Sequence, residues 1–321
     1  MVNLKDQLIV GRANLEVYSE TLMELAGRDR DILVVTSDSR GSGKLVPFAQ
    51  KYPGQIVETG IAEQNLVGIS AGLASCGKTV FATSPACFLA ARSLEQIKND
   101  VAYSGFPVNI VGISAGVSYG ALGSTHHSLH DIAALRAINN ILIVVPADNH
   151  ETRKAVRAAA ASDRPFYLRF GKKPVPHLYA PGAGFDIGKA SVLKDGDDIA
   201  FIACGEAVGP AYEAAQQLYR EGVGARVISM HTVKPLDNEA VIRAGLECRA
   251  VITVEEHSVF GGLGEACAAV LMEEGVAVPF RRVGIPDEYT VTGSQSDIFS
   301  HYDISAEGLS KIASGILQKV G

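Results

Sequence analysis

Apolar positions along this chain fall into two alternating kinds of segment. Short runs rich in β-branched residues predict buried strands, and the Ala- and Leu-rich stretches between them predict helices. Uninterrupted apolar runs are typical of parallel strands that are covered on both faces. In the first half, strands are predicted at 32–36, 54–59, 79–82, 108–113, 141–145 and 166–170, and helices at 62–74 and 149–161.

The alternation stops at 171–188 and then returns. That segment contains Pro174, Pro176 and Pro181 with several glycines and shows no apolar period, so it is predicted to be a linker. The pattern predicts an α/β fold: two three-layer α/β/α domains with mostly parallel sheets, at 1–175 and 189–321 around a linker of 176–188. In the second half, strands are predicted at 199–203, 225–229 and 250–254, and helices at 208–221, 238–245 and 261–274.

Composition narrows the class of protein. The 321 residues are 47% apolar, enough for two cores, and the net charge of −6 argues against a nucleic-acid partner. The five cysteines are scattered without CxxC spacing, which favours free thiols. No apolar stretch reaches membrane-spanning length without a break, and segment 1–6 lacks a signal-peptide pattern. We therefore expect a cytoplasmic protein with no membrane contact.

Glu63 is the first residue with candidate chemistry. It follows a predicted strand and begins a predicted helix, and catalytic groups of open α/β sheets gather at the carboxyl ends of strands. An acidic residue in a first helical turn also complements the helix dipole, so Glu63 alone favours the ordinary explanation.

Further segments of the sequence favour a catalytic role for Glu63 over the helix-dipole explanation. Their order and spacing, from about residue 12 to the C-terminus, resemble the pyrimidine-binding and C-terminal domains of the transketolase family. Each segment is weak evidence alone, and together they are specific. The resemblance implies the C-terminal half of a transketolase, present as a separate subunit. The matching segments are 60–74, 81–97, 124–127, 141–148, 232–237 and 255–264.

The resemblance implies thiamine diphosphate as cofactor. In that family a glutamate donates a hydrogen bond to N1′ of the cofactor's aminopyrimidine, and Glu63 matches it. To donate, the carboxyl group must carry a proton near neutral pH, so we expect it in a water-poor site. Phe88 matches an aromatic residue that stacks on the pyrimidine, and Asp38 and Ile61 match positions near the cofactor. Pro85 replaces a frequent second Phe, which alters the opposite wall of the pocket.

His126 matches the family histidine that faces the reacting sugar and handles its hydroxyl protons. A neutral imidazole can both give and accept a proton near neutral pH. His126 and His130 are four residues apart and are predicted to share a helix face, where a metal site would need further ligands that the sequence does not offer. We therefore expect no metal bound by this chain.

At the positions that match the family's substrate-binding residues, this sequence departs from the usual pattern. Ser42 matches a serine that contacts a phosphate, and Lys172 stands where an arginine is frequent, with Arg169 nearby. Ser114 replaces a family histidine used for the sugar phosphate, and Leu122 replaces an acidic residue that contacts the donor's second hydroxyl. The resemblance thus implies a changed anion pocket and a substrate other than the standard pair of pentose phosphates.

One family motif is missing. Transketolases hold the diphosphate and Mg²⁺ through a Gly-Asp-Gly motif with a downstream Asn, and these oxygen ligands suit Mg²⁺. The only similar string, at 195–197, is interpreted as a turn before the strand 199–203, and 255–257 as a packing turn. The resemblance implies that an N-terminal-half subunit supplies the diphosphate and Mg²⁺ site, in an α2β2 assembly.

The leading hypothesis is a transketolase subunit that transfers a two-carbon ketol unit from a ketose (phosphate) donor to an aldose acceptor. The beta subunit of a 2-oxoacid dehydrogenase, which shares the two-domain layout, is the alternative enzyme. A non-catalytic α/β scaffold is the third hypothesis, and Glu63, Phe88 and His126 argue against it.

Overall fold

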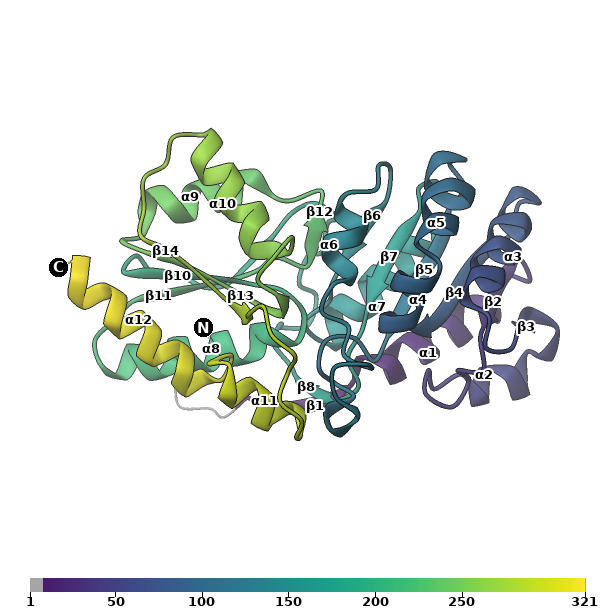
Figure 1. Cartoon of the computed structure of the whole chain (residues 1–321), viewed down its shortest axis with the longest axis horizontal. Helices are drawn as coiled ribbons and strands as arrows, with labels where there is room; N and C mark the ends of the chain where they lie inside the picture. The colour runs from purple at the N-terminus through teal and green to yellow at the C-terminus, as the bar shows by residue number, and fades with distance from the viewer. Residues whose placement is uncertain (1–7, 321) are drawn as a thin grey trace.

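A computed structural model describes residues 8–320 as two α/β bodies that lie side by side (Figure 1). Each body has a central sheet with helices on both faces, which confirms the predicted fold class. Segment 1–6, on which the signal-peptide expectation rests, is outside the described residues. Within residues 8–320, no helix combines the length and the hydrophobicity that a membrane crossing requires.

A seven-stranded sheet forms the centre of the first body, in the order β12-β6-β7-β5-β4-β2-β3. Strands β2 to β7 all pair in parallel, so helices cover both faces and the strands are mostly apolar. The six strands from the first half are β2 (Ile32–Thr36), β3 (Ile56–Glu58), β4 (Thr79–Pro85), β5 (Val108–Ile113), β6 (Leu142–Val144) and β7 (Phe166–Arg169).

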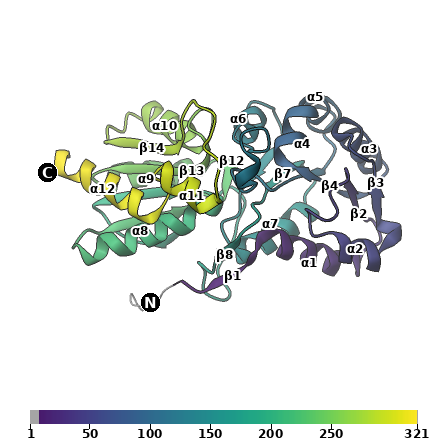
Figure 2. The same ribbon diagram turned by 60° about the horizontal axis from the view of Figure 1, so that its bottom comes forward.

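Two layers of helices cover this sheet (Figure 2). One layer holds α3 (Glu63–Ser75), α4 (Ala86–Arg92), α5 (Leu94–Gln96), a π-helical stretch (Ile97–Tyr103) and α6 (Asp131–Arg136). The other layer holds α1 (Asn14–Ala26), α2 (Val46–Lys51) and α7 (Asn149–Ala160). Separate apolar clusters lie between the sheet and each layer.

The second body is smaller and has a five-stranded sheet in the order β14-β13-β10-β11-β9, antiparallel only at β9. Helices α9 and α10 cover one face, and α8 and α12 cover the other (Figure 1). The strands are β9 (Ser191–Lys194), β10 (Ile199–Ala203), β11 (Ala225–Ser229), β13 (Val251–Ser258) and β14 (Phe280–Ile285). The helices are α8 (Val208–Arg220), α9 (Asn238–Glu247), α10 (Leu263–Glu273), α11 (Gln295–His301) and α12 (Ala306–Val320).

The two bodies share backbone as well as side-chain contacts. Strand β12 (Thr232–Lys234) comes from the second half of the chain but pairs antiparallel with β6 in the first sheet. Strand β8 (Pro174–Pro176) lies where the predicted first domain passes into the predicted linker, and it pairs with β1 (Val10–Ala13) in a two-stranded sheet where proline is tolerated at an edge.

Several boundaries also differ from the predictions. Residues 255–257 lie inside β13, rather than in a turn after it. His126 and His130 do not share a helix, because 124–126 form a turn and α6 begins only at Asp131. Gly123, with φ of 72°, holds a backbone conformation that interrupts a helix. The string 195–197 lies in the connection between β9 and β10, as predicted.

Candidate active site

The carboxyl edge of the first sheet gathers most of the predicted site residues. Glu63 opens α3 after β3, and Phe88 lies in α4 directly after β4. Asp38 follows β2 with φ of 50°, and Ser114 follows β5 with φ of 53°. Non-glycine residues in this left-handed region are uncommon and concentrate at functional sites, so the backbone itself marks this edge.

Glu63 is buried and ion-paired. Its side chain is 5% exposed, and its Oε1 accepts a hydrogen bond of 2.9 Å from Nη1 of Arg92, the last residue of α4. The guanidinium carbon of Arg92 also lies 4.1 Å from the ring centroid of Phe88, one helical turn earlier. The burial of Glu63 agrees with the expected water-poor site, whereas its pairing with Arg92 was not anticipated.

His126 lies between two aromatic rings. The centroid distances from its ring are 5.3 Å to Phe88 and 5.6 Å to Tyr119, both edge-to-face. Its Nδ1 is 3.0 Å from Oγ1 of Thr125, and Nζ of Lys172 lies 4.6 Å from the centroid of Tyr119. One run of contacts thus joins residues from four separate segments of the chain. We call Glu63, Phe88, Arg92, Tyr119, His126 and Lys172 the edge cluster.

The end of the edge cluster at Lys172, away from Glu63, favours an anionic ligand. Partial burial, and then the neighbouring ammonium groups of Lys44 and Lys173, lower the pKa of Lys172. Ser114 is fully buried, and within residues 8–320 its hydroxyl oxygen has no hydrogen-bond partner. Ser42 is half-buried, and its Oγ donates to the carbonyl oxygen of Ser39 at 3.2 Å.

Comparison with known proteins agrees with this geometry. Residues 11–177 match the family described as transketolase, pyrimidine binding domain, and residues 188–309 match transketolase, C-terminal domain. The chain belongs to the transketolase family.

Several relatives of this chain are themselves named as subunits. One of them, from Phocaeicola vulgatus, is named as a subunit of an apulose-4-phosphate transketolase, and it is 50% identical over 303 residues, which cover 94% of this chain and 96% of that protein. A 6-deoxy-6-sulfo-D-fructose transketolase subunit of Clostridium sp. is 34% identical over 304 residues, which cover 95% of this chain and 94% of that protein. A solved structure described as a split gene transketolase, inactive beta4 tetramer, is 37% identical to this chain and superposes with a TM-score of 0.86. The match covers 96% of this chain and 99% of the chain in that structure. The chain corresponds to the C-terminal half of a transketolase as a separate subunit.

Arg169, predicted to bind substrate together with His126 and Lys172, lies outside the edge cluster. Its side chain is 5% exposed, and its Nε donates to Oδ2 of Asp131 at 2.8 Å. Its Nη2 donates to the carbonyl oxygens of Ser128 at 3.0 Å and Glu256 at 2.9 Å. Because these donors are used where the two bodies meet, we leave Arg169 out of the proposed substrate pocket of this transketolase.

Buried carboxyl groups extend the contacts of Arg169 into the second body. Nε2 of Gln295 donates to Glu206 at 2.6 Å and to Glu256 at 2.8 Å. Burial raises the pKa of Glu206 to about 8 and that of Glu256 to about 7. Both carboxylate oxygens of Glu255 accept N–H groups at the start of α10, so Glu255 holds that helix end against β13. We call Asp131, Arg169, Glu206, Glu256 and Gln295 the junction cluster.

The loop that carries His126 is fixed by the second body, which sequence reasoning missed. The buried ring of His127 places Nδ1 at 2.6 Å from Oγ1 of Thr290 and Nε2 at 3.0 Å from the carbonyl oxygen of Gly120. A Cβ at Gly120 would lie 2.6 Å from the carbonyl oxygen of Gly293, so the approach requires glycine. Thr290 is far away in sequence, and no local pattern marks it.

Three other predicted or altered positions lie at the surface. Ile61 is 75% exposed and Leu122 is 55% exposed. Asp38 is exposed, and its backbone N–H donates to Oε1 of Glu58 at 2.6 Å. Exposed apolar side chains beside a site are expected where another subunit or a ligand covers them. Their roles remain predictions.

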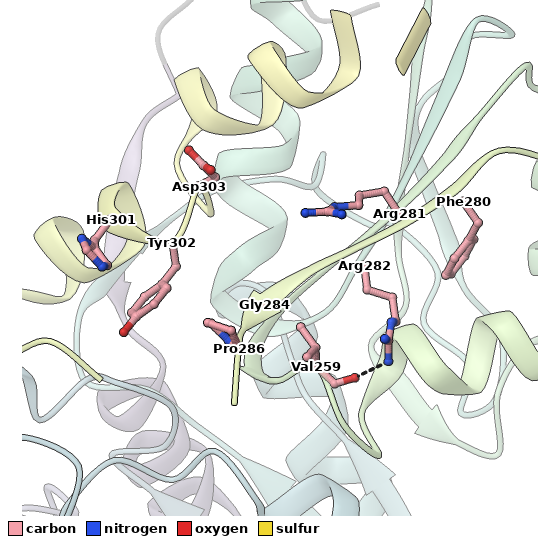
Figure 3. A pocket seen from close by; sticks show the side chains of 9 residues that line it. All are labelled: Val259, Phe280, Arg281, Arg282, Gly284, Pro286, His301, Tyr302 and Asp303. Atoms are coloured by element: carbon pink, nitrogen blue, oxygen red, sulfur yellow. Dashed lines mark hydrogen bonds between the residues drawn. The ribbon is translucent and has the colours of Figure 1, made fainter. Parts of the chain in front are cut away.

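A separate cavity of about 520 Å³ lies in the second body and contains none of the predicted residues (Figure 3). Arg281 and Arg282 line one side, and Tyr302 and Asp303 line another. Arg282 is already used, since its Nη1 donates to the carbonyl oxygen of Val259 at 2.7 Å. The candidate active site therefore stays at the edge of the first sheet.

Proposed function

We propose that this chain is the subunit of a thiamine-diphosphate-dependent transketolase that supplies the cofactor-activating glutamate, Glu63. The observation that carries the proposal is the edge cluster, in which Arg92 links the buried carboxyl group of Glu63 to the ring of Phe88, and that ring contacts His126. These are the groups needed to activate the cofactor and to move protons on a sugar. Family membership supports ketol transfer over the chemistry of 2-oxoacid dehydrogenases.

The residues present fit the pyrimidine half of the cofactor. Thiamine diphosphate, when bound, supplies the nucleophilic carbon that carries the two-carbon unit. Glu63 would hold a proton at N1′ of the aminopyrimidine, its burial excluding water, and Phe88 would stack on the ring. The only candidate for the diphosphate half, the string 195–197, lies in a turn where Asp195 pairs with Arg226 at 3.0 Å. We therefore assign the diphosphate and Mg²⁺ to a partner subunit.

His126 would handle the hydroxyl protons of the sugar. Its ring is held edge-on by Phe88 and Tyr119, and its Nδ1 lies beside the hydroxyl of Thr125. These contacts fix the ring plane and direct Nε2 as the working nitrogen. A fixed, half-buried imidazole can donate or accept a proton without a change of position.

The donor substrate is proposed to be a ketose that carries an anionic group. Burial and then the positive charges of Lys44 and Lys173 lower the pKa of Lys172, and a bound phosphate would offset this repulsion at Lys172. The buried hydroxyl of Ser114 offers an additional donor. Two relatives are named as transketolase subunits for apulose 4-phosphate and for 6-deoxy-6-sulfo-D-fructose, a sugar phosphate and a sulfo-sugar. Apulose 4-phosphate is therefore the first donor to test, ahead of xylulose 5-phosphate.

The partner is proposed to be an N-terminal-half transketolase subunit in an α2β2 assembly. Helix α3 presents an open face at Asn65, Gly68 and Gly72, and a Cβ at either glycine would meet nothing within 4 Å. Residues at this spacing share one helix face, and small side chains let another backbone approach closely. Because this face begins beside Glu63, a subunit docked on it would also cover the edge cluster.

Titration calorimetry with thiamine diphosphate and Mg²⁺ tests the assembly. We expect no binding to the purified chain alone and clear binding once the partner subunit is added. Tight binding by the chain alone would contradict the split site. On the assembled enzyme, turnover of ketose donors with aldose acceptors is expected, whereas turnover of pyruvate with a lipoyl carrier would favour the dehydrogenase alternative.

A further inference from the structure

Thr290, a residue of the second body, makes side-chain contacts on both sides of His126. It lies on the connection from β14 to α11 and is 7% exposed. Its Oγ1 is 2.6 Å from Nδ1 of His127 and 3.0 Å from Oγ of Ser124. These two partners stand one position after and two positions before His126, so one hydroxyl group joins the flanks of the proposed proton-handling residue.

The directions of these hydrogen bonds follow from the other nitrogen of the His127 ring. Nε2 lies 3.0 Å from the carbonyl oxygen of Gly120, which can only accept, so Nε2 carries the hydrogen. Burial lowers the pKa of His127 and favours the neutral ring, in which Nδ1 is then an acceptor. Thr290 therefore donates its hydroxyl hydrogen to His127 and accepts the hydrogen of Ser124.

A hydroxyl group is needed for this double contact. Thr290 uses its one donor and a lone pair of the same oxygen at the same time. Valine has nearly the size and shape of threonine but offers neither, whereas serine keeps both. The chemistry at position 290 can therefore be removed or kept with little change in packing.

The loop that carries His126 depends on contacts from outside, because its own backbone is irregular. Three glycines of this loop have positive φ: Gly116, Gly120 and Gly123. A Cβ at Gly123 would lie 3.1 Å from Cγ2 of Thr292, two positions after Thr290. The connection from β14 to α11 thus lies directly against the loop, and Thr290 supplies its hydrogen bonds there.

We propose that Thr290 is a positioning residue through which the second body fixes His126 for the handling of sugar protons. The inference rests on the proposed function, because Thr290 acts only through His126. It gives the second body, which contributes no residue to the edge cluster, a defined part in the reaction. Displacing a reacting group by about 1 Å can cost about 10²-fold in rate, so the effect of losing this anchor is measurable.

The direct test is steady-state turnover of the assembled enzyme carrying Thr290→Val. Loss of both hydrogen bonds should lower kcat by about tenfold. The dissociation constant of thiamine diphosphate should stay within about twofold of wild type, because Glu63 and Phe88 are unchanged. Thr290→Ser keeps the hydroxyl group and should hold kcat within about threefold of wild type. An unchanged kcat for Thr290→Val, or an equal loss for Thr290→Ser, would overturn the proposal.

Thr232→Val is the matched control. Thr232 is 1% exposed, and its Oγ1 lies 3.0 Å from Nδ1 of His231 and accepts the N–H of Gly188 at 3.1 Å. The control thus also removes a buried threonine hydroxyl beside a histidine ring, and neither partner belongs to the loop of His126. It should lower the urea midpoint of the free chain much as Thr290→Val does, yet leave kcat within about twofold of wild type. An equal loss of kcat in both variants would mean general destabilisation and would reject the positioning role.

A double-mutant cycle with His126→Ala separates positioning from general damage. If Thr290 acts through His126, adding Thr290→Val to His126→Ala should lower kcat by less than about twofold further. Losses that multiply independently would contradict the proposal.

Ser124→Ala is a milder variant for the same cycle, since it removes one of the two hydrogen bonds at a half-buried position. It should lower kcat by about two- to threefold, and this loss should disappear in the His126→Ala background. Full turnover of Ser124→Ala, or a loss that persists without His126, would count against the proposal even if Thr290→Val does not fold.

The outcomes separate the role of Thr290 from the proposed function. If His126→Ala keeps near-normal turnover, the role proposed for His126 fails and that of Thr290 fails with it. If His126→Ala lowers kcat but Thr290→Val does not, only the positioning role fails.

Discussion

The edge cluster and the junction cluster use similar side chains for opposite purposes. In the edge cluster, the buried Glu63 pairs with Arg92. In the junction cluster, Arg169 pairs with the buried Asp131 and also donates to the carbonyl oxygen of the buried Glu256. At the junction, Arg169 is almost wholly buried and its donors are directed at groups of the same chain. At the edge, Arg92 is half exposed. Within residues 8–320, buried oxygen atoms without a hydrogen-bond partner occur in both places: Oγ of Ser114 near the edge, and Oδ1 of Asp131 and Oε1 of Glu206 at the junction.

The difference shows how structural and functional polar groups can be told apart. A buried charge stabilises a fold when hydrogen bonds within the chain compensate it, as the three that Arg169 donates do. What sets the edge apart is the exposure of its arginine, because a polar group whose partner is open to solvent is available to a ligand. Residue type alone does not separate the two cases, since each cluster contains an arginine paired with a buried carboxylate.

The largest effect is expected from Glu63→Gln. The amide keeps the size of the side chain but cannot supply the carboxyl proton, so turnover of the assembled enzyme should fall by roughly 10²- to 10⁴-fold. Steady-state assays with the partner subunit measure this. The secondary structure of the free chain, followed by circular dichroism, should be unchanged, and near-normal turnover would contradict the role of Glu63.

Arg169→Met should damage stability instead of chemistry. It leaves the buried carboxylate of Asp131 without its cation, and breaking a buried pair costs about 3–5 kcal/mol in free energy of unfolding. Urea unfolding of the free chain checks this against Arg157→Met, which removes an arginine that is 48% exposed and pairs with Glu24 at 2.7 Å, and which should cost less than about 1 kcal/mol. A loss no larger than that of the control would mean that the junction does not hold the two bodies together.

The junction should also make stability depend on pH. Burial raises the pKa of Glu206 to about 8 and of Glu256 to about 7, so the folded chain holds protons that the unfolded chain releases above about pH 4.5. The free energy of unfolding should therefore fall as pH rises through that window, by up to about 1.4 kcal/mol per pH unit for each proton held. Glu206→Gln, which cannot ionise, should flatten the slope between about pH 6 and 8. An unchanged slope in urea unfolding would exclude Glu206 as its source.

The smallest effect is expected from Lys172→Met. Loss of one partly exposed cation should raise KM for a phosphorylated donor by about three- to tenfold and leave kcat nearly unchanged. Lys194→Met is the control, because Nζ of Lys194 lies 4.9 Å from the ring of Tyr219 in the second body, much as Lys172 lies near Tyr119. Equal KM values for the two variants would remove Lys172 from the anion pocket.

The sequence by itself determined the class of fold and the main candidates for chemistry. Continuous apolar runs predicted the parallel strands, because strands covered on both faces have no polar side to alternate with. The spacing of motifs around Glu63, Phe88 and His126 predicted residues that the structure brings into one run of contacts. These features are local, so a linear pattern can carry them.

Tertiary structure alone decided which polar groups are available to a ligand and which are used within the chain. Strand β12 is too short to predict, and it joins the first sheet by a pairing with β6 that spans nearly ninety positions, about the separation of Thr232 from Val144. The second body buries Arg169 and fixes the loop of His126 through Thr290, and the fold brings Arg92 onto Glu63. Burial and hydrogen bonding between distant segments set these contacts, and no pattern in the linear sequence records them.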